Sequence, residues 1–118
     1  MQCLQLTRGD PPATTVDVAL SGDFSSSFGY VTIDGTKYTS AQTITVAKGT
    51  SVTVYCWGKV LSSTKEKAKI TLNGTTVAQG TSDAAAEYTF SATDNCSIVM
   101  TEKTYTYKYY TADITMPA

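Results

Sequence analysis

Hydrophobic and polar residues alternate along most of the chain with a period of two, which is typical of half-buried β-strands. The first such run places Val16, Val18 and Leu20 on one face. The intervening Asp17 and Ala19 fall on the opposite face. Apolar residues nowhere recur with a sustained helical spacing, so we expect no helix longer than about two turns. Strands every 8–12 residues or so, with turn signals between them, predict an all-β sandwich or small barrel.

Two tight hairpins are predicted, one at Asp34-Gly35 and one at Asn73-Gly74. Each dipeptide lies between two β-prone runs, and a type I′ turn requires a positive φ at both central positions. Residues 31–36 match residues 70–75 in residue type at every position, and each hairpin is followed by a strand, a turn and another strand. The repetition predicts two duplicated four-strand units, which we expect to face each other because one unit cannot bury its apolar face alone.

The most regular alternation, in residues 51–57, predicts part of the core. Val52, Val54 and Cys56 share one face there, and polar or aromatic residues separate them. We expect these three side chains to point inward. Ile98 and Met100 alternate in the same way near the end of the second unit, and we expect them across the core.

The last segment, residues 104–116, contains a stripe of tyrosines. Tyr105, Tyr107 and Tyr109 share one face, whereas the apolar residues that follow, beginning with Ala112, take the opposite parity. This change predicts a bulge or a break near residues 110–111. Tyrosine offers a large contact area and a polar tip, so the stripe fits three roles: packing on the core, a protein interface, or stacking on sugar rings.

Residues 1–13 differ from the rest and predict an N-terminal arm, with the sandwich domain at residues 14–118. Pro11-Pro12 disfavours both a helix and a central strand. Leu4 and Leu6 alternate with Gln5, so the arm could add a strand to the exposed edge of a neighbouring molecule. The alternative is a loose tail on a monomer.

The amino-acid composition limits the kinds of partner that the chain can bind. The chain has 22 Thr and 11 Ser among 118 residues, only 16% charged residues and a formal net charge of −1. We expect no nucleic-acid binding, because that requires a basic surface. We also expect no membrane insertion, because no run approaches the roughly 20 apolar residues of a spanning helix.

Catalytic machinery is not expected. The chain has no histidine, which removes Ser–His and Cys–His nucleophile pairs. The acidic residues are scattered, without a shared motif, and we expect no metal and no cofactor. Cys3, Cys56 and Cys96 form no Cys-x-x-Cys pair. They are either three reduced, buried thiols or one Cys56–Cys96 disulfide with Cys3 free.

Four segments carry a resemblance to a known family. Residues 45–54, 70–75, 87–90 and 97–100 resemble the immunoglobulin-like domains of bacterial surface proteins and of accessory proteins on tailed-phage virions. The resemblance implies an Ig-like β-sandwich of about eight to nine short antiparallel strands. Trp57 directly follows Cys56, whereas antibody domains separate these two residue types, so the antibody disulfide is not carried over.

The resemblance implies a non-enzymatic structural protein of a phage virion, either a capsid decoration or a tail accessory subunit. Its partners would be other virion proteins or copies of itself. The alternative is an adhesion module on the bacterial cell surface or outside the cell, which binds a host surface glycan or a protein. The absence of a secretory signal at the start of the chain favours the virion. The candidate interface residues are Leu4, Leu6, Tyr105, Tyr107 and Tyr109.

Overall fold

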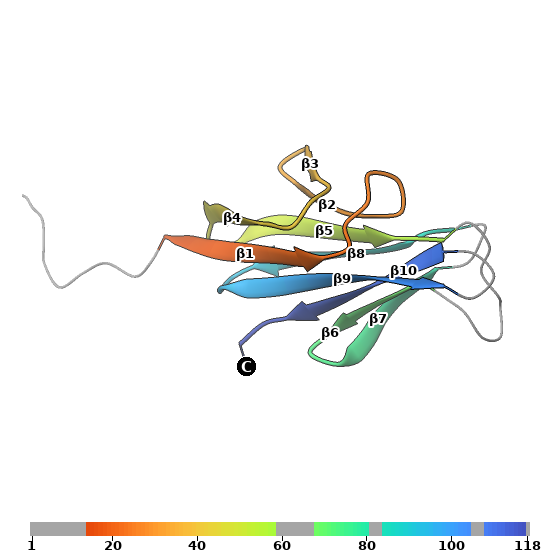
Figure 1. Ribbon diagram of the computed structural model, residues 1–118. Helices are drawn as coiled ribbons and strands as arrows, with labels where there is room; N and C mark the ends of the chain where they lie inside the picture. Colours follow the sequence, from red (N-terminus) through yellow and green to blue (C-terminus); the bar gives the residue numbers. More distant parts are fainter. Residues whose placement is uncertain (1–13, 59–67, 81–83, 105–107, 118) are drawn as a thin grey trace, which may run out of the picture.

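The computed structural model describes residues 14–58, 68–80, 84–104 and 108–117. These residues form two β-sheets that pack against each other, which confirms the predicted all-β sandwich (Figure 1). The ten strands are β1 (Thr15–Gly22), β2 (Gly29–Ile33), β3 (Thr36–Tyr38), β4 (Gln42–Ala47), β5 (Thr50–Cys56), β6 (Ala68–Leu72), β7 (Thr75–Gly80), β8 (Ala86–Ala92), β9 (Cys96–Thr104) and β10 (Lys108–Thr115). The predicted arm, residues 1–13, lies outside the described residues, so its boundary stays a prediction.

One sheet has six strands in the order β4-β1-β9-β10-β6-β7, and the other has four in the order β3-β2-β5-β8. In Figure 1, β2 and β5 lie in the upper layer, and β9, β10 and β6 lie in the lower layer. The structure differs in two details from the expected eight to nine short antiparallel strands. The described residues contain ten strands, and the pairs β1–β9 and β10–β6 are parallel. Alternation predicts which side chains are buried but is silent on strand direction, because both pairings have the same period of two.

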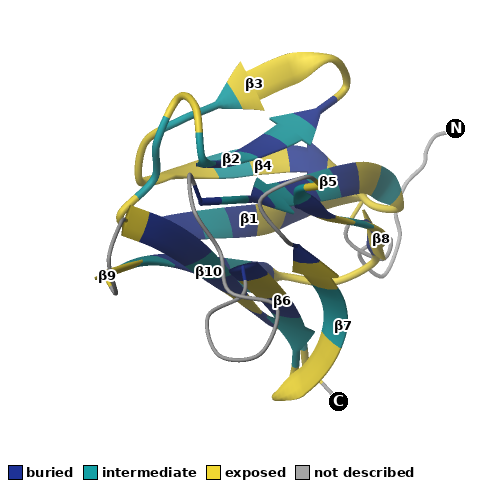
Figure 2. Cartoon of the chain, turned by 90° about the vertical axis from the view of Figure 1, so that its right-hand side faces the viewer, coloured by how far each residue is buried: buried dark blue, intermediate teal, exposed yellow. Residues whose placement is uncertain are grey.

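The core lies between the two sheets and follows the predicted alternation. Val52, Val54 and Cys56 of β5 are fully buried, and so are Ile98 and Met100 of β9 in the opposite sheet. Figure 2 shows this as buried segments that alternate with intermediate or exposed ones along the strands. The predicted inward faces of β5 and β9 are therefore confirmed. The other buried hydrophobic residues are Val16, Val18, Leu20, Val31, Ile33, Val46, Ala68, Ile70, Ala86, Phe90, Ala92, Cys96, Tyr109, Tyr110, Ala112 and Ile114.

Both predicted hairpin turns are present. Asp34 and Gly35 have φ of 50° and 79°, and Asn73 and Gly74 have φ of 49° and 87°. The flanking pairs Ile33–Thr36 and Leu72–Thr75 close two-residue loops. Asp and Asn tolerate the left-handed region because their short polar side chains form local hydrogen bonds, and glycine tolerates it because it has no Cβ. The two dipeptides therefore fix the register of their hairpins.

The repetition predicted that each four-strand unit forms one sheet, and the structure differs from this prediction. Counting β2–β5 and β6–β9 as the units, the third strand of each belongs to the other sheet: β4 pairs with β1, and β8 pairs with β5. The side chains explain the exchange of β4, because its pairing places Val46 beside Val16 and Ile44 beside Val18. Apolar cross-strand pairs of this kind stabilise a sheet, and the internal repeat carries no information about them.

The bulge predicted near residues 110–111 is not present. The pairing of β9 with β10 runs in constant register from Lys108–Thr104 to Thr115–Ser97. The change of parity arises because Tyr109 and Tyr110 are both buried although successive residues point to opposite faces of a strand. The pairing of β6 with β7 does contain a register shift, at residues 70–71.

One corner of the sandwich joins the two sheets through the backbone. Trp57, which follows β5, donates its N–H to the carbonyl of Phe28 at 2.7 Å and accepts a hydrogen bond from the N–H of Tyr110 at 3.0 Å. Gly58 forms an isolated bridge with Tyr109. The ring of Phe28 lies 5.1 Å from that of Trp57 and 6.3 Å from that of Tyr110. This aromatic packing closes the end of the core to which β5 and β10 contribute.

Candidate interaction surface

The outer face of the four-stranded sheet gathers half-buried tyrosines, threonines and exposed charged side chains. We call it the tyrosine face. It consists of Tyr30 and Thr32 of β2, Lys37 of β3, Ser51, Thr53 and Tyr55 of β5, and Glu87, Thr89 and Ser91 of β8. These residues point outward because they alternate with the buried residues of the same strands, and residues that pair across strands share a face.

Two tyrosines form the centre of this face. Tyr30 and Tyr55 are direct cross-strand partners, and their ring centroids lie 4.6 Å apart with an interplanar angle of 21°. The ammonium group of Lys37 lies over the Tyr30 ring, 4.1 Å from its centroid. Glu87 is the cross-strand partner of Tyr55 on the other side. Tyr30, Tyr55 and Glu87 therefore lie at one level of the sheet. Lys37 pairs with Thr32 at the next level, but its ammonium group reaches the level of Tyr30.

Hydroxyl groups occupy the next level. Thr32 is the cross-strand partner of Thr53, which is in turn the partner of Thr89. The hydroxyls of Thr53 and Thr89 share a hydrogen bond of 2.8 Å. Because their hydrogen-bonding capacity is partly used within the sheet, these side chains present a flat, weakly polar surface beside the tyrosines.

The charges of the tyrosine face lie at its two edges. Lys37 belongs to the edge strand β3, and Glu87 belongs to the edge strand β8. Partial burial, followed by the neighbouring Tyr55 and Glu87, raises the pKa of Tyr30 above its ordinary value. Its hydroxyl is therefore neutral at physiological pH. The face thus has a neutral aromatic centre between a positive edge and a negative edge.

This arrangement is suited to contact with another surface. Protein interfaces are enriched in tyrosine and depleted of charge at their centre, and they are polar at the rim. One face of the Tyr30 ring lies against Tyr55 and the other lies under Lys37, which leaves chiefly the ring edge exposed. A sugar that stacks on tyrosine needs an open ring face, so the geometry at Tyr30 is better matched to a protein surface.

Of the five residues that the sequence proposed as an interface, the structure describes only Tyr109. Leu4, Leu6, Tyr105 and Tyr107 lie outside the described residues. Tyr109 is only 8% exposed and belongs to the hydrophobic cluster of the core, which is the first of the three roles considered for the tyrosine stripe. Burial leaves little of its surface for a partner.

Sequence reasoning missed Tyr30 and Tyr55, although a signal for both was present. Tyr55 lies between Val54 and Cys56, which the pattern assigned to the core, so it had to point outward. Tyr30 directly precedes Val31 in a β-prone run, so it had to point to the side opposite that valine. What the pattern could not supply is the pairing of β2 with β5, which brings the two rings together.

The outer face of the six-stranded sheet is different in character. Asp17 accepts a hydrogen bond from the hydroxyl of Thr45 at 2.8 Å, and Asp113 accepts one from Thr71 at 2.6 Å. Val99 of β9 is the cross-strand partner of Asp113 and is 38% exposed. These carboxylates are each held by a threonine hydroxyl, which explains them as parts of a stable strand surface.

The two cysteines of the described chain, Cys56 and Cys96, are buried and not joined to each other, so the alternative of a Cys56–Cys96 disulfide is wrong. Burial raises the pKa of Cys56 to about 12 and also raises that of Cys96. The Cys56 thiol donates a hydrogen bond to the carbonyl of Lys69 at 3.4 Å. A thiol is a weak nucleophile until it is deprotonated, so both side chains behave as small apolar groups at neutral pH.

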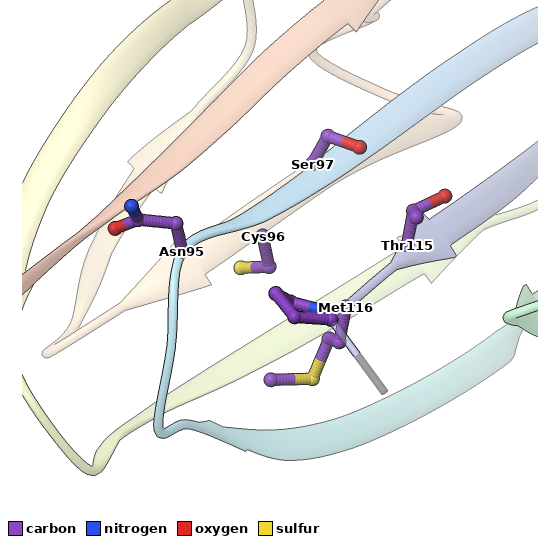
Figure 3. Close-up of a pocket in the computed structure, with 6 residues that line it drawn as sticks. Asn95, Cys96, Ser97, Thr115 and Met116 are labelled. Atoms are coloured by element: carbon purple, nitrogen blue, oxygen red, sulfur yellow. The ribbon is translucent and has the colours of Figure 1, made fainter.

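A shallow surface pocket of about 350 Å³ lies at the end of β9 and β10, where its lining includes Cys96 and Met116. Figure 3 shows the hydroxyls of Ser97 and Thr115 directed away from these two sulfur atoms. The pocket is lined mainly by apolar atoms and lacks a charged side chain. Within the described ranges, no three His, Cys, Asp or Glu side chains are grouped so that they could hold a metal ion.

Comparisons with known proteins add no family to this picture. No protein-family model, curated protein or solved structure matches the chain. In the part of the chain that the structure describes, no helix is long and apolar enough to cross a membrane.

Proposed function

We propose that this chain is a non-enzymatic structural protein, an accessory subunit of a tailed-phage virion that works by surface contact. The observation that carries the contact role is the tyrosine face, where stacked Tyr30 and Tyr55 lie between Lys37 and Glu87. The virion assignment rests on the resemblance of residues 45–54, 70–75, 87–90 and 97–100 to immunoglobulin-like domains of such particles.

The chemistry of the described side chains supports contact rather than catalysis. General acid–base catalysis needs a group whose pKa lies near the working pH. Burial moves the pKa values of Cys56 and Cys96 away from neutrality, upward in both cases. The carboxylates of Asp17 and Asp113 accept hydrogen bonds from threonine hydroxyls on an exposed sheet face. Neither pair forms an acid and a base that converge on a cavity.

The second candidate is an adhesion module on the bacterial surface that binds a glycan. The half-buried tyrosines on an outer sheet face favour it, because aromatic rings are common contacts in recognition sites. The covered ring of Tyr30 weighs against it, since stacking on a sugar requires an open ring face. We therefore propose a protein surface, rather than a glycan, as the binding partner of the tyrosine face.

Mass spectrometry of density-gradient-purified phage particles from the source organism tests the proposal. We expect the chain to sediment with the particles at a fixed ratio to the major capsid or tail protein. Its absence from the particles, together with its recovery from the cell envelope, would contradict the virion role and support the adhesion module.

A rebinding assay then locates the contact. Particles that lack the chain are incubated with purified protein, and the bound fraction is measured after sedimentation. We expect Tyr55→Ser to bind more weakly than the unaltered chain. Val99→Ser, which changes the exposed apolar residue of the other sheet, serves as the matched control and should bind normally.

A further inference from the structure

The tyrosine face has a feature that a general contact surface does not need: it is complementary to itself. Its four central residues follow the strand order β3, β2, β5, β8 as Lys37, Tyr30, Tyr55 and Glu87. Reversing this order exchanges a positive residue with a negative one and a tyrosine with a tyrosine. An interface between two identical copies across a two-fold axis has this self-complementary form.

We propose that the tyrosine face binds the same face of a second copy of this chain. A two-fold axis parallel to the strands, midway between β2 and β5, places Tyr30 of each copy opposite Tyr55 of the other. The same axis places Lys37 opposite Glu87. This inference deepens the proposed function by naming one contact of the subunit, and it rests on that function for its biological purpose.

Charge complementarity is the observation that selects a second copy as the occupant. Lys37 reaches from its own level, opposite Thr32, to the ring of Tyr30, so its charge lies at the level of Tyr55 and Glu87. Face-to-face pairing then brings two opposite charges together at each edge and none at the centre. Opposite charges across an interface fix its register and exclude partners that carry like charges.

The area of the tyrosine face indicates how strongly two copies should bind each other. At about 3.4 Å per residue, the seven residues of β5 span about 24 Å. Four strands at about 4.8 Å spacing, widened by their side chains, cover roughly 20 Å. Because β3 has only three residues and β2 only five, the contact would bury roughly 400 Å² per copy, or about 800 Å² in total, which is below the usual area of stable interfaces. A weak dimer is expected, and many copies on one particle would make such a contact effective through multivalency.

Sedimentation equilibrium of the purified full chain, from about 10 μM to about 1 mM, measures this association. We expect a reversible monomer–dimer equilibrium. Tyr55→Ser should weaken dimerisation about tenfold or more, because central aromatic residues dominate small interfaces. Lys37→Glu and Glu87→Lys should each weaken it, because each creates two like-charge contacts. Circular dichroism confirms that each variant is folded.

The decisive sample is an equal mixture of Lys37→Glu with Glu87→Lys. A heterodimer of these two variants carries two opposite-charge contacts, the native one between Lys37 and Glu87 and a second one with the signs exchanged, so the mixture should associate more strongly than either variant alone. High salt should reduce this recovery of dimerisation in the mixture, because the Debye length falls to about 3 Å at 1 M and the charges are then screened. Lys69→Glu reverses an exposed charge on the other sheet and should leave dimerisation unchanged.

Three results would overturn the inference. The chain could be monomeric throughout the range, it could form a dimer that is indifferent to Tyr55→Ser, or the mixed charge variants could show no recovery. A monomer that binds a glycan through Tyr55 would assign the face to a sugar instead. None of these results concerns the presence of the chain in purified particles, so failure here would leave the virion role standing.

Discussion

Val54 is the residue at which the account of the core can be tested most sharply. It is fully buried in β5, and its cross-strand partners are Val31 and Tyr88. Val54→Ala removes two buried methyl groups, and the loss of their burial lowers the free energy of unfolding by about 1.6 kcal/mol, at about 0.8 kcal/mol each. A residual cavity of about 50 Å³ adds roughly 1.2 kcal/mol at about 24 cal/mol per Å³. We therefore expect a loss of about 2–3 kcal/mol in the free energy of unfolding.

This loss is a large part of the stability expected for the domain, which is about 6–18 kcal/mol for 118 residues. Differential scanning calorimetry should show a melting temperature lower by roughly 10 °C, and urea titration gives the free energy itself. Thr53→Ala, one residue away on the outer face, removes the hydrogen bond to Thr89 and should cost no more than about 1 kcal/mol. Equal effects at Val54 and Thr53 would refute the assignment of their faces. Val54→Asp should prevent folding, because an unpaired buried carboxylate costs several kcal/mol.

Three further predictions concern the turns and the buried thiol. Gly35→Val and Gly74→Val should each lower the free energy of unfolding by about 1–2 kcal/mol, because a β-branched residue resists positive φ, and unchanged urea midpoints would contradict this. Asn73→Ala should lower the free energy of unfolding by about 1 kcal/mol more than the matched Asp34→Ala, because the Asn73 side chain also accepts a hydrogen bond from the N–H of Met116 at 2.9 Å. Equal losses of stability in thermal melts of the two variants would show that this hydrogen bond does not stabilise the fold. Burial raises the pKa of Cys56 to about 12, so the thiol ionises at lower pH in the unfolded chain than in the folded one. The free energy of unfolding should therefore fall between about pH 9 and 12, by up to about 1.4 kcal/mol per pH unit. A Cys56→Ala variant whose free energy of unfolding has the same slope with pH would show that another group causes the fall.

The core could be predicted from the sequence because it depends on local alternation. Val52, Val54 and Cys56 had to share a face in any extended conformation, and their burial depends only on that face meeting another. The turns were equally accessible, because Asp-Gly and Asn-Gly have local conformational preferences that need no tertiary context.

Strand pairing could not be predicted in the same way, because it depends on contacts between distant residues. β4 pairs with β1, and β8 pairs with β5, across the boundary of the apparent duplication. The sequence repeat suggested units that pair within themselves. The structure instead matches Val16 with Val46, a choice that depends on the combined packing of both sheets.

The candidate surface shows the same division. The outward direction of Tyr30 and of Tyr55 follows from alternation, but their stacking follows from the β2–β5 pairing. Tyr109 was misleading in the opposite sense. Its stripe suggested an exposed face, yet the bridge between Gly58 and Tyr109 places it where the two sheets meet, and it is buried there.

A dilution series followed by nuclear magnetic resonance tests most directly whether the tyrosine face pairs with the same face of a second copy of this chain. Backbone and tyrosine-ring signals are assigned and then recorded from low to high protein concentration. We expect concentration-dependent shifts at Tyr30, Tyr55, Lys37 and Glu87, with the signals of Val99 on the other sheet unchanged. Shifts centred on Val99, or no shifts at any concentration, would contradict this pairing.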